Sequence, residues 1–315
     1  MREKRNFAER TRVLPSGETR KKYFLVYEGK KTEGLYFDGI MNSRNEIGID
    51  PLIELVPIVR SYSEEGWSNP GKIVDRILQN LKEAESGIIS YETLLNWIMD
   101  YLEEEDMIRN NRPAAAYMWG ILEKICIEKM NVKLSDRVGD VGTACMQIAG
   151  HIDTESQWDN VIEDVPAVIE DRALTYDKEI DKICFIIDRD RDSFVSTEEK
   201  DQYHDVLDKC RRNAFGFYLT NPCFEFWLLL HFEEVLGLDI QKLLDNPKVS
   251  AKRRYTEQEL RRLLPGYSKS KYNVGFLMSR IGKAIENEKN FCEDENQLEY
   301  MVGSRVGLLM KELIK

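Results

Sequence analysis

Carboxylates follow two short apolar segments that lie far apart in this chain. Glu28 comes directly after the run 23–27, and Asp188 and Asp190 come after the run 183–187. A short apolar run bounded by charged residues and glycine is typical of a buried strand. In open α/β sheets ligands bind beyond the carboxyl ends of such strands, and carboxylate oxygens are preferred ligands of hard divalent cations. The sequence therefore predicts a divalent-metal site formed by acids from two strand ends.

The acids near residue 190 also fit two other interpretations. Asp188, Asp190, Asp192 and Glu199 match positions 1, 3, 5 and 12 of an EF-hand calcium loop. The position that requires glycine for its turn is Ser193, however, and a β-branched segment precedes the loop where an EF-hand has a helix. The strand-end metal site is therefore favoured over a calcium loop, and a run of solvated surface charges remains the third interpretation.

The segments around these acids predict an α/β fold. A turn at Gly29 and a helix over 33–42 follow the first strand, and Thr32 is expected to cap that helix. A second strand is expected over 52–59 and a helix after 69. The third strand, 183–188, is followed by a helix over 197–211 and a strand over 214–219. This order predicts a mainly parallel sheet flanked by helices.

A long segment interrupts this alternation from about residue 85. Apolar residues recur there at helical spacing, for example Leu94, Leu95, Ile98 and Leu102, and there is little strand signal. We expect a flexible basic leader over 1–20, a core built from 21–84 and 181–275, a helical insertion over 85–180, and a C-terminal helical segment over 276–315 that packs on the core. The insertion is either a self-contained bundle or a surface for a partner or a second copy of the chain.

The apolar segment 223–232 is predicted to be a buried helix, and Glu225 is its one charged residue. A carboxylate in the first turn of a helix is favoured by the helix dipole. If Glu225 is buried, it must be paired or bind a metal, because an unpaired buried charge is too costly. His231 lies six residues later, roughly 240° around the helix, and is either a hydrogen-bonded core histidine or a further ligand.

Charge limits the kinds of partner. The net charge of −11 over 315 residues argues against indiscriminate coating of nucleic acid, which depends on neutralising phosphates. Basic residues are nevertheless concentrated in the leader and in 242–271, where nine lysines and arginines stand against three acids. Either cluster alone is explained by a solvated helix face or tail. Together they would suit a groove that follows phosphates.

The termini and the cysteines bear on location. The first residues lack the apolar core of a signal peptide, and no apolar run reaches the roughly 18 residues of a membrane span. The six cysteines show no CxxC pairing, so we expect them to be reduced and mostly within the core. We therefore expect a cytoplasmic protein that does not contact a membrane.

Longer motifs around these residues resemble the RloB-like and OLD-like nucleases of the Toprim superfamily, which are associated with phage defence. The segment 28–37, EGKKTEGLYF, resembles the EGxxTExxYF motif that opens RloB proteins. The segment 221–232 resembles their NPxFExWxLxHF helix, and 267–271, YSKSK, resembles a late lysine motif. A Toprim domain also pairs a Glu after its first strand with a DxD motif after a later one. The resemblance covers roughly residues 20–84 and 181–275, and the segment between them departs from it.

The resemblance implies a Toprim fold, which is Rossmann-like, and a two-metal phosphodiesterase that uses Mg²⁺ or Mn²⁺. Asp188 and Asp190 would bind one metal, and Glu28 would bridge the metals or position the attacking water. The second metal would bind Glu33 and Glu225. Lys269 or Lys271 would stabilise charge on the scissile phosphate. Further candidates are Asp192 and His231 for the metal site and Lys30, Lys31, Arg253 and Arg254 for nucleic-acid binding.

The expected function is therefore a metal-dependent endonuclease acting on DNA or RNA in phage defence, by abortive infection or restriction. No GxxxxGK[ST] phosphate loop occurs, so the ATPase that accompanies related Toprim components would be a separate chain, and a second copy of this chain is another candidate partner. The alternative is a non-catalytic interaction subunit with a structural metal site. A topoisomerase or a primase is less favoured, because there is little room for a tyrosine domain and no primase zinc module.

Overall fold

The computed structural model describes residues 7–9, 21–27, 31–58, 70–86, 89–104, 112–152, 174–189, 194, 201–251 and 253–314. The chain divides into two compact units. The first unit comprises residues 1–12, 59–68 and 72–177, and the second unit comprises residues 13–58, 69–71 and 178–315. All of the predicted site residues that the structure describes belong to the second unit.

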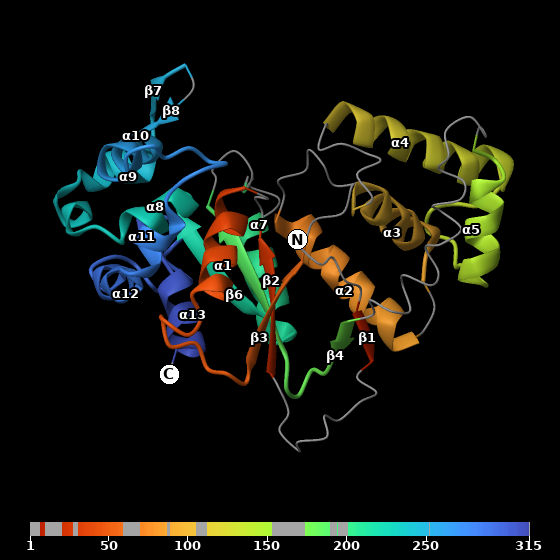
Figure 1. Ribbon diagram of the computed structural model, residues 1–315, viewed down its shortest axis with the longest axis horizontal. Coiled ribbons are helices and arrows are strands. Elements are labelled where there is room, and N and C mark those ends of the chain that lie inside the picture. Colours follow the sequence, from red (N-terminus) through yellow and green to blue (C-terminus); the bar gives the residue numbers. More distant parts are fainter. Residues whose placement is uncertain are drawn as a thin grey trace. The chain divides into compact units, whose positions relative to one another are not determined.

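The second unit contains a five-stranded sheet with the strand order β3-β2-β5-β6-β9 (Figure 1). Its strands are β2 Lys21–Tyr27, β3 Ile53–Ile58, β5 Lys182–Asp188, β6 Gly216–Asn221 and β9 Gly303–Ser304. The first four in this order run parallel, and β9 pairs antiparallel with β6. The predicted α/β class, with a mainly parallel sheet flanked by helices, is confirmed.

The central strands are buried on both faces, as expected for a parallel sheet between helices. In β2 the residues from Tyr23 to Tyr27 are at most 4% exposed, and in β5 those from Ile183 to Ile187 are at most 1% exposed. This burial explains why continuous apolar runs, rather than alternating patterns, marked these strands in the sequence. The strand predicted over 214–219 begins later, at Gly216, because Ala214 adopts a left-handed conformation with φ 55° that a strand does not accept.

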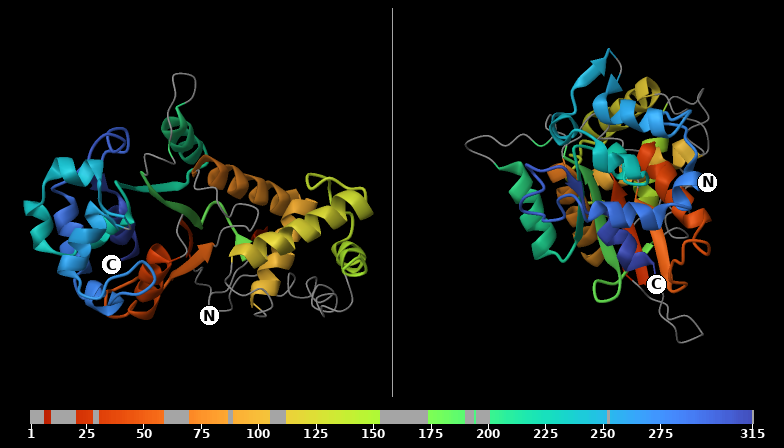
Figure 2. Two further views of the ribbon diagram at one scale, coloured as in Figure 1. Left: turned by 90° about the horizontal axis from the view of Figure 1, so that it is seen from above. Right: turned by 90° about the vertical axis from the view of Figure 1, so that its left-hand side faces the viewer.

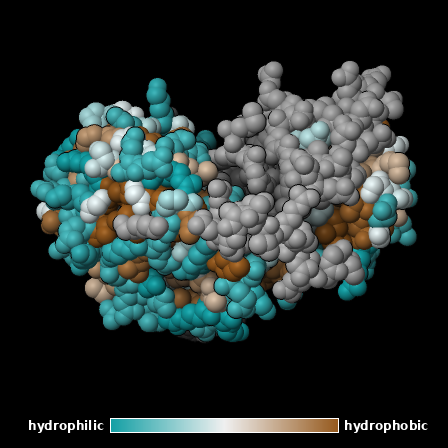
Figure 3. Space-filling view, turned by 60° about the horizontal axis from the view of Figure 1, so that its bottom comes forward, coloured by the Kyte–Doolittle hydropathy of each residue, from teal (hydrophilic) through white to brown (hydrophobic). Residues whose placement is uncertain are grey.

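Helices cover both faces of this sheet (Figure 2). One face packs against α7, Gln202–Arg212, where Tyr203 contacts Phe217 of β6 edge to face. The other face belongs to a core with α1, Thr32–Asn42, and α8, Phe224–Leu229. The remaining helices of the second unit are α9 Ile240–Asp245, α10 Tyr255–Leu263, α11 Val274–Met278, α12 Ile281–Glu288 and α13 Val306–Leu313. On the face drawn in Figure 3 the surface of this unit is mainly hydrophilic.

Two expectations about where helices of the second unit begin are corrected. Thr32 is the first residue of α1 and not its cap, which is Lys31. The helix predicted over 197–211 begins at Gln202, because the Asp201 side chain accepts a hydrogen bond from the amide of His204 and caps it. Residues 197–200 lie outside the described residues.

The buried helix predicted over 223–232 is correct in burial but too long. It ends at Leu229, and a 3₁₀ turn follows over Glu233–Gly237. The side-chain amide of Asn287 donates to the carbonyl oxygens of Leu230 and Phe232, at 2.8 and 3.2 Å. These carbonyls would otherwise continue the helix, so a residue from α12 sets its end. The angular relation predicted between Glu225 and His231 therefore does not apply.

The first unit contains a separate hydrophobic core. The helices of this unit are α2 Pro70–Ser86, whose first two residues belong to the second unit, α3 Tyr91–Glu104, α4 Arg112–Lys124, a π-helical turn Ile125–Lys129 and α5 Val141–Ala149. The residues expected at helical spacing, Leu94, Leu95, Ile98 and Leu102, are fully buried within this core. Of the predicted leader, the structure describes Phe7–Glu9 as strand β1, paired in parallel with β4, Leu174–Tyr176.

All six cysteines are unpaired, and all but Cys223 are buried. Among the described residues, no helix has the length and apolar composition that a membrane crossing would require.

Candidate functional site

A cavity of about 480 Å³ lies at the carboxyl end of β5 and β6, within the size range of ligand sites in proteins. Three residues predicted to act in catalysis or metal binding line it: Asp188, Glu225 and Lys269. The two arginines predicted to contact nucleic acid, Arg253 and Arg254, line it as well. The fold thus brings together five predicted residues from separate parts of the sequence.

The sheet positions both acids at this edge. Asp188 is the last residue of β5 and pairs with Thr220 of β6. The chain leaves β6 at Asn221 and enters α8 at Phe224, so Glu225 lies in the first turn of that helix. Burial and the charges of Glu225 and Asp188 together raise the pKa of the Cys223 thiol. Both carboxylates line the cavity together with Cys223.

Glu225 forms the central ion pair of the cavity. Its side chain is 5% exposed, and its Oε1 lies 3.0 Å from Lys269 Nζ. The phenol of Tyr267 donates a hydrogen bond to the same oxygen at 3.3 Å. Burial by itself would raise the pKa of Glu225, but the Lys269 ammonium and the hydrogen bonds to the carboxylate hold its pKa below the usual value. Glu225 is therefore a buried, ionised carboxylate, paired as the energetics of buried charge require.

The charges of both acids, Glu225 and Asp188, act on the ammonium group of Lys269. The Glu225 carboxylate, and more weakly Asp188, raise the pKa of Lys269 above its usual value. Its side chain is nevertheless 62% exposed, so the ammonium can contact both the buried acid and a ligand that enters from solvent. The sequence motif YSKSK pointed to this lysine but did not indicate its partner.

Contacts with α1 hold the loop that carries Lys269. The phenol of Tyr272 donates to the carbonyl oxygen of Thr32 at 2.6 Å, across 240 residues of sequence. The hydroxyl of Thr32, which was expected to cap the helix, donates instead to the carbonyl oxygen of Lys269 at 3.4 Å. The motif that begins the first helix and the late lysine motif therefore meet in the fold.

A basic hairpin stands beside the cavity. It consists of β7, Lys248–Ser250, and β8, Arg253–Arg254, whose residues are exposed. Figure 1 shows that this hairpin projects beyond α9 and α10. Lys248 joins the two arginines in the cavity wall. A ligand that reaches Glu225 would therefore meet several positive charges, as a phosphate-bearing ligand requires.

The other predicted residues lie elsewhere or outside the described residues. Glu33 is buried in the first turn of α1, where its charge adds to the burial that raises the pKa of Tyr272. Lys31 and Lys271 are exposed, and neither is among the residues that line the cavity. The predicted residues outside the described ranges are Glu28, Lys30, Asp190 and Asp192.

His231 is a fully buried histidine with hydrogen-bonded ring nitrogens. Its Nε2 lies 3.1 Å from the hydroxyl of Tyr36, and its Nδ1 lies 3.2 Å from the carbonyl oxygen of Trp227. Burial lowers the pKa of His231 to about 4, so the ring is neutral near pH 7. Its surroundings are those of a hydrogen-bonded core histidine, which was one of the two interpretations of the sequence.

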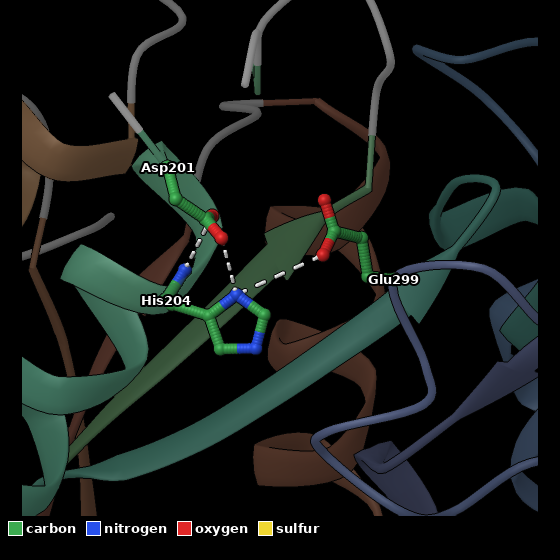
Figure 4. Close-up of side chains that lie close together, drawn as sticks. All are labelled: Asp201, His204 and Glu299. Carbon is green, nitrogen blue, oxygen red and sulfur yellow. Dashed lines mark hydrogen bonds and ion pairs between the residues drawn. The ribbon is translucent and has the colours of Figure 1, made fainter. Parts of the chain in front are cut away.

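A second cluster, to which the sequence analysis assigned no role, could hold a metal ion. It consists of Asp201, His204 and Glu299, whose potential ligand atoms all lie within 4.8 Å of one another. His204 Nδ1 is 2.7 Å from Asp201 Oδ2 and 3.9 Å from Glu299 Oε2 (Figure 4). The spacing of Asp201 and His204, DxxH, at the start of α7 can be read from the sequence. Nothing in the sequence indicates that Glu299, 95 residues after His204, lies beside them.

The cavity and the cluster of Asp201, His204 and Glu299 differ in how many metal ligands their described residues supply. In the cavity, Asp188 and Glu225 supply the carboxylate oxygens that hard cations prefer. Among the residues that the structure describes, however, they are not part of a three-ligand group of the kind formed by Asp201, His204 and Glu299. The predicted ligand set in the cavity therefore depends on Glu28 and Asp190 as well.

The second unit is thus an α/β domain with an ionised carboxylate, a lysine and a basic hairpin at the carboxyl edge of its parallel sheet. The chain belongs to the RloB-like protein family, whose model matches residues 23–313. This confirms the predicted family and extends the match through residues 85–180, where we expected a departure from it. Comparison with curated proteins and with solved structures found no match.

Proposed function

We propose that this protein is a metal-dependent nuclease of the Toprim type that hydrolyses phosphodiester bonds of DNA or RNA in phage defence. The observation that carries the proposal is the cavity in which Asp188, the ionised Glu225 and Lys269 converge beside Arg253 and Arg254. Membership of the RloB-like family supports a role in defence. Carboxylates and basic side chains that line the same cavity suit a substrate with a negatively charged backbone and a bound cation.

The residues that would hold Mg²⁺ or Mn²⁺ are Asp188 and Glu225, which line the cavity, together with Glu28 and Asp190 from the sequence prediction. Such an ion would make the attacking water more acidic and neutralise charge on the phosphate oxygens. Asp188 and Glu225 both offer the hard oxygen ligands that these ions require. Glu225 is already held ionised by Lys269, so no proton has to leave it before a cation binds.

The lysine and the arginines have separate roles in this proposal. Lys269 contacts Glu225 through an ammonium that remains largely exposed, so it can also balance negative charge that develops on the scissile phosphate or the leaving oxygen. Arg253 and Arg254 would hold flanking phosphates, contacts that position a nucleic acid without reading its sequence. The partners that we propose are a nucleic-acid substrate and a separate ATPase subunit.

Chelation tests the requirement for metal. We expect purified protein to cleave at least one of plasmid DNA, single-stranded DNA and tRNA in Mg²⁺ or Mn²⁺, to lose this activity in EDTA, and to regain it when metal is added in excess. The measurement is product formation on denaturing gels with the protein concentration held constant. Cleavage that persists in EDTA after exhaustive dialysis would contradict a metal-dependent mechanism.

Replacement of both hairpin arginines tests phosphate binding. We expect Arg253→Gln with Arg254→Gln to weaken binding to all duplex sequences alike and to reduce the slope of log Kd against log salt by roughly 1 to 2, because each lost phosphate contact contributes about 0.9. Arg261 and Arg262 lie on the neighbouring α10 and pair with Glu257 and Glu259. The same double replacement there is the matched control. An equal change of slope in the hairpin variant and the α10 variant would contradict the proposal that the hairpin arginines bind phosphates.

A further inference from the structure

The cluster of Asp201, His204 and Glu299 lies on the α7 side of the sheet in the second unit (Figure 4). Asp201 caps α7, and His204 follows within the first turn of that helix. Glu299 comes from the segment that leads into β9. One imidazole nitrogen and two carboxylates therefore converge from two parts of the chain that are distant in sequence.

One carboxylate oxygen of Glu299 is buried without a hydrogen-bond partner among the described residues, which indicates that a ligand could bind there. The Glu299 side chain is 2% exposed, and its Oε1 accepts a hydrogen bond from Arg189 Nη2 at 3.1 Å. Its Oε2 is buried and has no hydrogen-bond partner among the described residues. A hydrogen-bonding interaction with Glu299, and then the Glu299 charge, raise the pKa of the exposed Tyr300 phenol, but Oε2 has no partner at hydrogen-bonding geometry among the described residues. A buried unsatisfied group of this kind costs roughly 1–3 kcal/mol.

Hydrogen bonds hold the backbone around the cluster, the Asp201 side chain and the guanidinium of Arg189 in place. The amide of Asn221, at the end of β6, donates to the carbonyl oxygens of Leu298 and Glu299, at 2.7 and 3.2 Å. The amide of His204 donates to Asp201 Oδ1 at 3.1 Å. The guanidinium of Arg189 is itself fixed by a hydrogen bond to the carbonyl oxygen of Phe194 at 3.2 Å. The cluster is thus organised before any ligand arrives.

The distances suit a small dication. Ligands about 2.1 Å from a tetrahedral metal lie roughly 3.4 Å apart. His204 Nδ1 is 2.7 Å from the Asp201 oxygen and 3.9 Å from the Glu299 oxygen, so shifts below about 1 Å would bring all three to bonding distance. Arg189 would orient Glu299 from behind, as second-layer partners of metal ligands commonly do.

We propose that Asp201, His204 and Glu299 form a metal site separate from the cavity, which takes a transition-metal dication such as Zn²⁺ or Mn²⁺. A donor set of one imidazole and two carboxylates favours these ions over Mg²⁺. Bound there, the ion links the start of α7 to the segment before β9 and satisfies Glu299 Oε2. The proposal does not depend on nuclease activity.

Co²⁺ is a suitable probe, because a nitrogen and oxygen site of low coordination number gives it a visible absorption band. The full chain carrying Asp188→Asn, which weakens any site in the cavity, is titrated with Co²⁺. We expect one equivalent to bind with a visible band, and His204→Gln in the same background to weaken that binding by at least about tenfold. His204 is partly exposed, so this replacement leaves the core intact.

Matched controls are His151→Gln, an exposed histidine of the first unit, and Asp205→Asn, an exposed acid of α7 next to His204. Both should retain the Co²⁺ band. Zn²⁺ should raise the melting temperature of wild type and of both controls, but not of His204→Gln, because binding to the folded state stabilises it. A band and a melting shift unchanged by His204→Gln, or no Co²⁺ uptake at millimolar metal, would overturn the proposal.

Discussion

Asp188→Asn should reduce the rate of metal-dependent cleavage about 10³-fold while the protein stays folded. Asp188 ends β5 at the cavity and interacts electrostatically with both Lys269 and Cys223. Asparagine has the same size and retains one carbonyl oxygen, but it carries no charge to bind a dication. The rate should be measured in a single turnover at saturating Mg²⁺ or Mn²⁺, with circular dichroism as the check on folding.

Asp245→Asn is the matched control for this change. Asp245 lines the same cavity and is exposed, but no part of the proposed chemistry uses it. We expect its rate to stay within about threefold of wild type, in line with the small effects typical of surface substitutions. Equal losses in the two variants would mean that Asp188 acts only through the general charge of the cavity. A loss below tenfold for Asp188→Asn would contradict its role as a metal ligand.

Glu288→Gln should stabilise the protein at alkaline pH. Glu288 is fully buried at the end of α12, and its Oε1 accepts a hydrogen bond from the amide of Gly307 at 2.8 Å. Its Oε2 has no hydrogen-bond partner among the described residues. Burial raises the pKa of Glu288 to about 8, so the folded protein keeps a proton that the unfolded chain releases near pH 4.5.

The sign of the pH dependence follows from this difference. Between the unfolded pKa and about 8, the folded state holds one more proton than the unfolded state at this group, so stability falls as pH rises. The slope is at most about 1.4 kcal/mol per pH unit, which gives a loss of roughly 2 kcal/mol between pH 6.5 and 8. Most other carboxylates are already ionised in this window. Above pH 8 the loss should level off.

Urea unfolding at a series of pH values measures this effect. In Glu288→Gln the decline between pH 6.5 and 8 should disappear, because glutamine stays neutral. Glu286→Gln is the control: Glu286 is exposed on the same helix, and the hydrogen bond and charge of Lys289 lower its pKa, so it is ionised in both states. If the decline is the same in wild type and Glu288→Gln, another group causes it.

The sequence predicts the sheet well because burial on two faces leaves an unmistakable pattern. The runs at 23–27 and 183–187 are apolar throughout, and both are interior strands. The helix at 224–229 shows the limit of such reasoning. Its apolar run continues to Phe232, but Asn287, more than fifty residues away in sequence, takes the carbonyls that would extend it. Only the folded chain brings that amide to the helix end.

The candidate site, like the fold, could be predicted from the sequence only in part. Motif spacing identifies Glu225 and Lys269, because each lies in a short motif whose residues are close together in the sequence. Their direct ion pair, and the contact of Tyr267 with the same oxygen, depend on the path of the loop over α1. The Asp201, His204 and Glu299 cluster could not be predicted, since Glu299 reaches it through contacts with Asn221 and Arg189. The roles of Glu28 and Asp190 stay predictions.

The central claim is that a metal ion binds in the cavity between Asp188 and Glu225. It can be tested without a substrate or a partner by replacing Mg²⁺ with Fe²⁺ and adding ascorbate and peroxide, which cut the chain next to the bound ion. The cut sites are then located by mass spectrometry of the fragments. We expect cuts close to residues 188 and 225 that excess Mg²⁺ suppresses and that Asp188→Asn abolishes. Cuts that lie only elsewhere, or that Asp188→Asn leaves unchanged, would contradict the claim.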